Sequence, residues 1–137
     1  MMKIFGYLMT AIVFTVVFSG GATAVFAQNM QNTVVKKQVK FARGQHKATL
    51  RGNAKYAMSY VFNLRAKKGQ TMDIRLTGKN SQLTFSLIAP NEETIEDAFG
   101  VSEWSGELPQ SGNYSIVVVM NDEDATNIPY TLEVKIE

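Results

Sequence analysis

A turn that leads straight into a long β-branched run is the feature of this sequence that most restricts its fold. Pro109-Gln-Ser-Gly112 has the composition of a loop tip, and Tyr114-Ser-Ile-Val-Val-Val-Met120 follows almost at once. Valine, isoleucine and tyrosine favour strands, and a short apolar run bounded by turn residues is typical of a strand buried on both faces or nearly so. We therefore expect a central strand here, with Val117 or Val119 pointing into the core.

Short strands of alternating hydrophobicity account for most of the chain from residue 39 onward. Apolar residues recur at every second position, which is the period of a half-buried strand. The clearest sets are Tyr56, Met58, Tyr60, Phe62 and Leu64; Met72, Ile74 and Leu76; Leu83, Phe85 and Leu87; and the closing segment, residues 130–136. Further strands are expected at residues 39–41, 47–51 and, as an edge strand bearing Trp104, 102–108. With no persistent helical period, this pattern predicts an all-β fold: one small, jelly-roll-like β-sandwich of about seven to eight strands.

The first 27 residues have the features of a signal peptide. Lys3 supplies the positive start, residues 4–18 are almost wholly apolar, and small residues lead up to Ala27 and Gln28 as at a cleavage site. The apolar run is short of the roughly 20 residues that a bilayer span needs, although an uncleaved anchor is the alternative. The predicted plan is a signal peptide over residues 1–27, a flexible leader over 28–37 and the β-sandwich over 38–137. We expect an exported protein, periplasmic or extracellular, with no membrane contact after signal cleavage.

Charge is divided unevenly along the chain, which has no cysteine and therefore no disulfide. Residues 28–90 hold 12 lysines and arginines but one acid, Asp73, whereas residues 91–137 hold 11 acids and one base, Lys135. Strands of a sandwich interleave, so opposite charges are expected to pair across neighbouring strands. The alternative is an acidic loop patch that steers a basic partner. The compensating acidic half and the lack of an aromatic–basic motif argue against a nucleic-acid partner.

Several motifs resemble those of bacterial pre-peptidase C-terminal type domains. They are Phe41-Ala-Arg-Gly44, Ala48-Thr-Leu-Arg-Gly52, Tyr60-Val-Phe62 and Ala66-Lys-Lys-Gly-Gln-Thr-Met72 at the start, and Trp104-Ser-Gly-Glu-Leu-Pro-Gln-Ser-Gly-Asn-Tyr114 and Tyr130-Thr-Leu-Glu-Val134 at the end. The resemblance covers nearly all of residues 39–136, and free-standing exported versions resemble the periplasmic inhibitors of g-type lysozyme. It implies a monomer or weak dimer that blocks a lysozyme cleft with loops and uses no cofactor. The alternative is an orphan module that binds carbohydrate or cell-envelope polymer, or has a structural role.

Two segments are candidates for the partner contact. Several lysozyme-inhibitor families insert a Ser-Gly-x-x-Tyr loop into the enzyme, and here a version one residue shorter occurs. Where g-type inhibitors carry arginines after this strand, this chain has an acidic loop. The predicted partner-binding residues, expected together at one end of the sandwich, are Ser111, Gly112, Asn113, Tyr114, Asp122, Glu123 and Asp124.

Each of these segments also has a structural interpretation. A tyrosine at the position of Tyr114 is commonly a core or corner residue, and Ser111 and Gly112 are ordinary turn formers. Trp104 is expected to close one end of the core, although an exposed binding anchor is the alternative. Tyr56, Tyr60 and Phe62 lie on one face of an expected strand and are expected to pack in the core.

Catalysis and metal binding have little support in the sequence. The single histidine, His46, lies among Arg43 and Lys47 with no carboxylate to orient it, and neither a cysteine nor a Gly-x-Ser-x-Gly elbow is present. Clustered loop acids could form a glycosidase pair only if the fold fixed their separation. The acidic Asp122-Glu123-Asp124 segment lacks the alternate spacing and glycine of a calcium loop, although a loose calcium site is the alternative. We therefore expect a non-catalytic protein without metal or cofactor.

Overall fold

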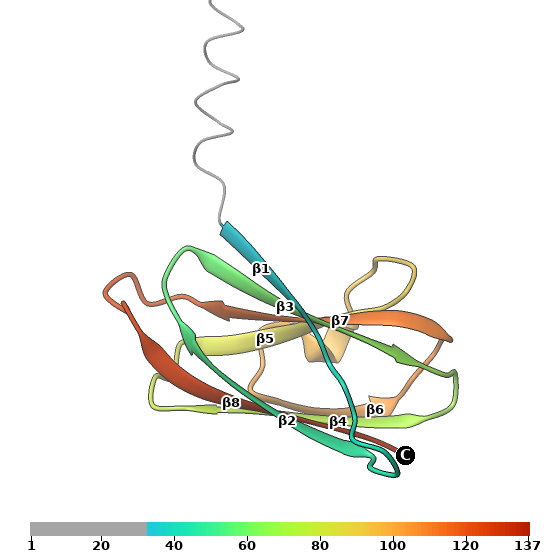
Figure 1. Cartoon of the computed structure of the whole chain (residues 1–137). Helices are drawn as coiled ribbons and strands as arrows, with labels where there is room; N and C mark the ends of the chain where they lie inside the picture. The colour runs from blue at the N-terminus through green and yellow to red at the C-terminus, as the bar shows by residue number, and fades with distance from the viewer. Residues whose placement is uncertain (1–32) are drawn as a thin grey trace, which may run out of the picture. The chain divides into compact units, whose positions relative to one another are not determined.

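The computed structural model describes residues 33–137 and shows eight strands in two packed four-stranded sheets (Figure 1). Sheet A has the order β1 (Thr33–Gln38), β3 (Met58–Ala66), β7 (Gly112–Met120), β5 (Leu83–Ile88). Sheet B has the order β2 (Lys47–Ala54), β8 (Ile128–Ile136), β4 (Thr71–Gly78), β6 (Glu103–Glu107). Consecutive strands therefore lie in different sheets, and one 3-10 turn, η1 (Glu96–Ala98), is the only helical element of the described residues. The predicted all-β sandwich is confirmed.

The core lies between the sheets and takes every second residue of most strands, as the period-two pattern predicts. Its largest fully buried side chains include Phe62 and Tyr114 from sheet A and Leu132 from sheet B. Tyr130 of sheet B packs against Tyr60 and Phe62 of sheet A, with ring centroids 5.9 and 6.4 Å apart. Such tilted and edge-on aromatic pairs add about 1 kcal/mol each beyond the area that they bury. These contacts hold together two sheets that no disulfide links.

Strand β7 is central, as predicted, but only one of its faces is in the core. It pairs with β3 on one side and β5 on the other. Ile116 and Val118 are fully buried, whereas Val117 and Val119 are half-buried on the outer face. The expectation that Val117 or Val119 points inward is therefore wrong. Val117 instead lies opposite Val61 on β3, a cross-strand apolar pair of the kind that stabilises an exposed sheet face.

The N-terminal boundary of the sandwich also differs from the sequence prediction. Residues 33–38 form β1, which pairs in parallel with β3, so part of the expected leader over residues 28–37 belongs to the fold. The side chains of β1 are mostly exposed, and they lack the alternation that reveals a strand. The predicted signal peptide, residues 1–27, and residues 28–32 lie outside the described residues. Within the described part, no helix is long and apolar enough to cross a membrane.

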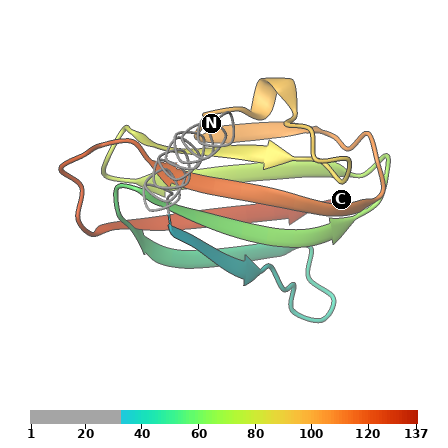
Figure 2. The ribbon, with the colours of Figure 1, turned by 90° about the horizontal axis from the view of Figure 1, so that it is seen from above.

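Strand β7 runs from one end of the sandwich to the other (Figures 1 and 2). Residues 108–111 lead into β7 at one end, called here the Ser111 end, together with the β3–β4 connection, residues 67–70. Residues 121–127 lead from β7 to β8 at the other, the Asp122 end, together with the β2–β3 connection, residues 55–57. Nine strand residues at about 3.3 Å each put these two connections about 30 Å apart.

Candidate partner-binding site

At the Ser111 end, the predicted contact motif forms a corner of the fold. The Ser111 hydroxyl oxygen accepts a hydrogen bond from the backbone N–H of Lys68, 2.8 Å away, and so joins two connections. Tyr114 is completely buried. Its hydroxyl donates to the carbonyl oxygen of Gln110 at 2.6 Å and accepts from the N–H of Gln110 at 3.1 Å. A tyrosine hydroxyl bonded to the backbone a few residues upstream is a recurrent way to close a corner of a β-sandwich.

Gly112 is fixed by backbone geometry in the same corner. Its φ of +142° lies in a region that residues with a side chain rarely adopt, and a Cβ there would come within 2.9 Å of Pro90. Asn113, opposite Arg65 on β3, is exposed. The structural role considered for Ser111, Gly112 and Tyr114 therefore accounts for all three, and only Asn113 presents a side chain without such a role.

At the Asp122 end, the acidic loop is held in shape by its first carboxylate. Asp122 accepts hydrogen bonds from the Asn80 side-chain amide at 2.8 Å and from the backbone N–H of Asp124 at 3.0 Å. These two bonds, the Asn80 bond first, lower the pKa of Asp122 below its ordinary value. Glu123 and Asp124 are exposed. No three His, Asp or Glu side chains within residues 33–137 come together in a way that could hold a metal ion.

The two predicted contact segments do not meet. Ser111 precedes β7 and Asp122 follows it, so the expectation that both lie at one end of the sandwich is wrong. The acidic loop instead lies beside Tyr56, whose backbone N–H donates to the carbonyl oxygen of Ala125 at 3.1 Å. The Tyr56 side chain is 44% exposed, so its predicted place in the core is also wrong. The cause is local: Ala57 has a φ of 64°, and this turn ends the alternation before β3 begins.

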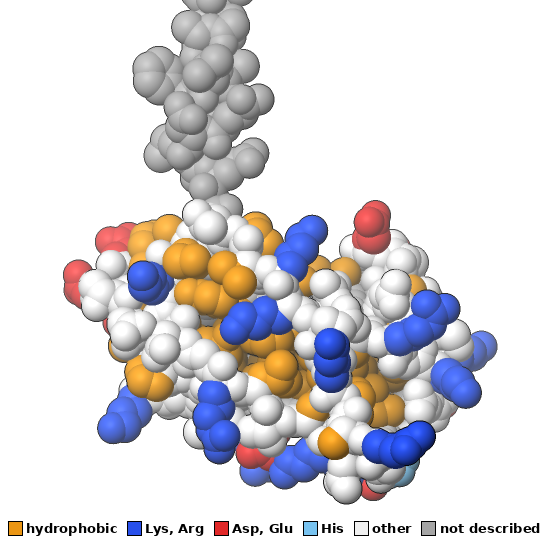
Figure 3. All heavy atoms as spheres, viewed as in Figure 1, with side chains coloured by type: hydrophobic (Ala, Val, Ile, Leu, Met, Phe, Trp, Pro, Cys, Tyr) orange, Lys and Arg blue, Asp and Glu red, His pale blue; other side chains and the backbone are white. Residues whose placement is uncertain are grey.

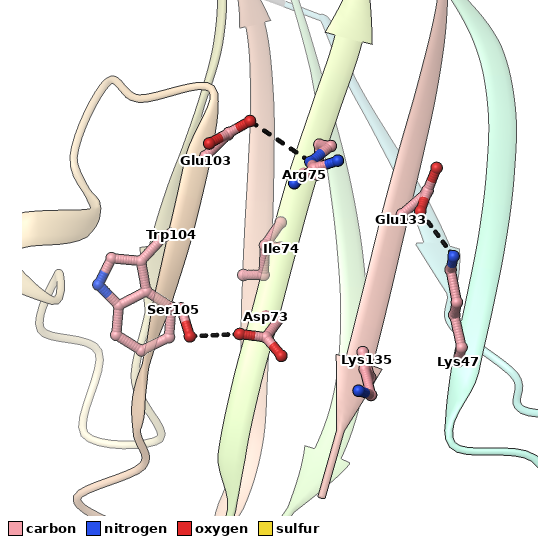
Figure 4. A pocket seen from close by; sticks show the side chains of 9 residues that line it. All are labelled: Lys47, Asp73, Ile74, Arg75, Glu103, Trp104, Ser105, Glu133 and Lys135. Atoms are coloured by element: carbon pink, nitrogen blue, oxygen red, sulfur yellow. Dashed lines mark hydrogen bonds and ion pairs between the residues drawn. The ribbon is translucent and has the colours of Figure 1, made fainter.

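A shallow groove of about 560 Å³ crosses the outer face of sheet B (Figure 4). Four of its charged side chains pair with one another across the strands, and Lys135 pairs with Glu137 just beyond the end of its own strand. Lys47 lies 2.8 Å from Glu133, Arg75 lies 3.4 Å from Glu103, and Ser105 donates a hydrogen bond to Asp73. The hydrogen bond from Lys47 lowers the pKa of Glu133. The predicted cross-strand pairing is therefore present in sheet B, and a surface whose charges pair with each other holds few free groups for a ligand.

Trp104, from edge strand β6, forms part of the groove wall (Figure 4). It is only 9% exposed, so it closes the core as predicted and does not act as an exposed anchor. Its ring lies over Gly106, where an added Cβ would come within 2.5 Å of the indole.

Two four-stranded sheets that take alternate strands of the chain, with a tyrosine corner before the central strand β7, define a small β-sandwich. The pre-peptidase C-terminal domain of a collagenase from Bacillus anthracis matches 76% of this chain and 96% of that domain, with a TM-score of 0.54 and 14% identity. At that identity the likeness concerns the fold alone.

A closer likeness defines the family. PliG of Aeromonas hydrophila, a periplasmic lysozyme inhibitor of g-type lysozyme, is 32% identical, with a TM-score of 0.66, over 77% of this chain and 99% of that one. PliG of Salmonella Typhimurium shares the fold at 21% identity and a TM-score of 0.60, over 75% of this chain and 98% of its own. The chain belongs to the PliG family. No protein-family model and no curated protein sequence matches it.

Proposed function

We propose that this protein is an exported, non-catalytic inhibitor of a g-type lysozyme. The observation that carries the proposal is the 32% identity with the Aeromonas hydrophila inhibitor over 99% of that chain. The relatives are periplasmic, which agrees with the signal peptide expected over residues 1–27. A compact single sandwich of this kind would act as a plug, presenting loops to the substrate cleft of the enzyme.

The proposed enzyme contact is the Asp122 end, formed by Asp122, Glu123, Asp124 and the neighbouring Tyr56. Lysozymes are generally basic proteins, so an acidic loop would speed their encounter more than it would tighten the final complex. An exposed tyrosine is a frequent energetic anchor of protein interfaces. The Ser111 corner is less suited to this role because its serine and tyrosine hydroxyls already serve the fold.

The function is tested with the purified exported protein against g-, c- and i-type lysozymes, using the clearing of a cell-wall suspension. We expect inhibition of a g-type enzyme at near-stoichiometric ratios. If no lysozyme is inhibited at a large molar excess, the proposal fails. Co-sedimentation with insoluble peptidoglycan would then test the alternative, a module that binds envelope polymer without affecting turnover.

The contact is tested by the rates of association and dissociation. The triple change Asp122→Asn, Glu123→Gln, Asp124→Asn is expected to slow association about tenfold and to flatten its salt dependence. Tyr56→Ala is expected to raise the dissociation rate about thirtyfold, as for an interface residue worth about 2 kcal/mol.

Matched controls distinguish the effect of the acidic loop from the effect of the protein's net charge. The triple change Glu92→Gln, Glu96→Gln, Asp97→Asn removes three exposed acids in and before η1 and should leave both rates near wild type. Equal slowing by this control would mean that only the net charge matters. Asn113→Ala should change neither rate, and an increase in dissociation from this change alone would move the contact to the Ser111 end.

A further inference from the structure

The strands of sheet A carry no acidic residue, and this distinguishes the two sheets. Their charged residues are all basic: Lys36 and Lys37 on β1 and Arg65 on β3. Sheet B is balanced, with Lys47, Arg51, Arg75 and Lys135 against Asp73, Glu103, Glu107 and Glu133. Basic side chains can therefore pair with acids on neighbouring strands in sheet B but not in sheet A.

The basic edge of sheet A lies on the same side of the molecule as the edge strand β2 of sheet B (Figures 1 and 2). Seen from this side, apolar side chains form a strip with lysines and arginines around it, and acids only at the margins (Figure 3). We call this surface the β1–β2 face. Its residues belong to β1, β2, the start of β3 and the connections on either side of β2. The apolar members are Val34, Val35, Phe41, Leu50 and Met58, and the basic members are Lys36, Lys37, Lys40, Arg43, Arg51 and Lys55.

The apolar strip is open because few large side chains close this side of the sandwich. The inward positions of β2 are mostly small, with Ala48, Gly52 and Ala54. On β1, Lys37 is aligned with the inward Phe62 of β3, at a position where a core residue would otherwise stand. Val34 is 51% exposed, and the other apolar members of the face are half-buried.

The basic side chains of this face form no ion pairs within the described part of the chain, although Arg51, on the sheet B side, lies close enough to Glu133 to help lower the pKa of that carboxyl. The ion pairs among the described residues join Lys47 with Glu133, Arg75 with Glu103 and Lys135 with Glu137, and none involves the six basic residues of the face. The sequence from residue 33 to 72 contains no acid at all. Lysines on an edge strand deter pairing with another chain. That role explains β1 but not Arg43 and Lys55, which lie outside the strands.

We propose that the β1–β2 face binds the surface of an anionic lipid bilayer. Partly exposed apolar side chains can enter the boundary between headgroups and acyl chains while the surrounding lysines and arginines contact acidic headgroups. The long aliphatic stems of lysine and arginine extend the apolar area of such a face. No spanning segment is required. Continuous apolar runs in the sequence do not reveal such a face, because it is assembled from separate strands.

The proposal is tested by co-sedimentation of the exported protein, its N-terminus verified by mass spectrometry, with lipid vesicles. We expect binding to mixed phosphatidylcholine–phosphatidylglycerol vesicles, weakening with salt, and little binding to phosphatidylcholine alone. The triple change Lys36→Gln, Lys37→Gln, Lys40→Gln is expected to lower the partition coefficient about a hundredfold, since each basic residue near an anionic surface contributes roughly a fivefold factor.

Matched controls test whether the effect belongs to this face. Lys67→Gln, Lys68→Gln, Lys79→Gln removes the same charge from the exposed connections at the two ends and should reduce binding much less. Val34→Ser should weaken binding, whereas Phe99→Ser, at a residue 71% exposed next to η1, should not. The melting temperature and lysozyme inhibition of each variant are measured in parallel and should remain near wild type, so this test and that of the proposed function can fail separately.

Several results would overturn the proposal. They are no binding to anionic vesicles at low salt, equal binding to neutral vesicles, or an equal loss in the two lysine triples. Binding to a soluble anionic polysaccharide with no binding to vesicles would also overturn it, because the face would then recognise polymer charge without a bilayer.

Discussion

Tyr114→Phe is the change that best separates a corner residue from a contact residue. The buried ring would remain in place, but its hydroxyl would be lost, together with the 2.6 Å and 3.1 Å hydrogen bonds to the backbone of Gln110. Each bond contributes about 1 kcal/mol net, and Gln110 is half-buried, so water can replace only part of them. We therefore expect a loss of about 1.5 kcal/mol in the free energy of unfolding, which lowers the melting temperature of a domain of this size by about 6–12 °C.

The measurement combines thermal melting with urea unfolding, both followed by circular dichroism. An unchanged m-value would confirm that the change alters stability and not the extent of unfolding. Tyr56→Phe is the matched control because it removes the same atom from an exposed tyrosine, and it should stay within about 0.5 kcal/mol of wild type. Below the melting transition, Tyr114→Phe should inhibit lysozyme as well as the wild type does.

One combination of results would refute this reasoning. If Tyr114→Phe melted like the wild type and yet lost lysozyme binding, the hydroxyl would serve the partner and not the corner. The Ser111–Tyr114 contact predicted from the sequence would then be correct, and the proposed contact at the Asp122 end would be wrong.

Three further predictions concern the core, alkaline stability and metal. Val118→Asp should leave the domain unfolded, because a buried unpaired carboxylate costs much of the 5–15 kcal/mol by which small domains are typically stable, whereas the outward Val117→Asp should melt cooperatively with a loss of about 1 kcal/mol. Burial, together with the neighbouring Tyr60, raises the pKa of Tyr130 from 10.0 to about 12. Above pH 10 the unfolded chain releases this proton while the folded chain keeps it, so stability should fall as pH rises through this window, and Tyr130→Phe should reduce the slope in urea titrations at each pH. Excess calcium should leave the melting temperature unchanged, and a rise reversed by chelator would reveal a site in the acidic loop, since a ligand that binds only the native state must stabilise it.

The sequence predicts those strands that have one buried and one more exposed face, because their apolar and polar residues alternate. Strand β5 contains the predicted alternation, because Leu83, Phe85 and Leu87 are buried while the residues between them are half-buried. Strand β1 could not be found in this way. Its residues are mostly exposed, and it belongs to the sandwich through a parallel ladder to β3, a long-range contact with no local signal.

The partner-binding site is harder to predict than the strands, because it depends on which connections lie at the same end of the sandwich. The composition around Ser111 predicts the turn that is present, but the nine-residue strand β7 takes the chain to the far end of the sandwich before the acidic loop begins. Tyr56 continues the period-two pattern of β3, so alternation alone places it in the core. The turn at Ala57 that exposes it has no glycine or proline to reveal it.

The alternation of strands between sheets explains how a charge division along the chain becomes a division across the molecule. In sheet B the order β2, β8, β4, β6 places strands from the basic and acidic halves side by side, and their charges pair. In sheet A the strands β5 and β7 carry no charge, so nothing neutralises the lysines of β1. Many of the remaining acids lie in connections, beside η1 and in the loop after β7. The proposed contact with a basic enzyme and the proposed contact with an anionic bilayer therefore use surfaces of opposite charge. These surfaces adjoin at the β2–β3 connection, where Lys55 belongs to one and Tyr56 to the other, so a lysozyme assay on vesicle-bound protein shows whether both partners bind at once.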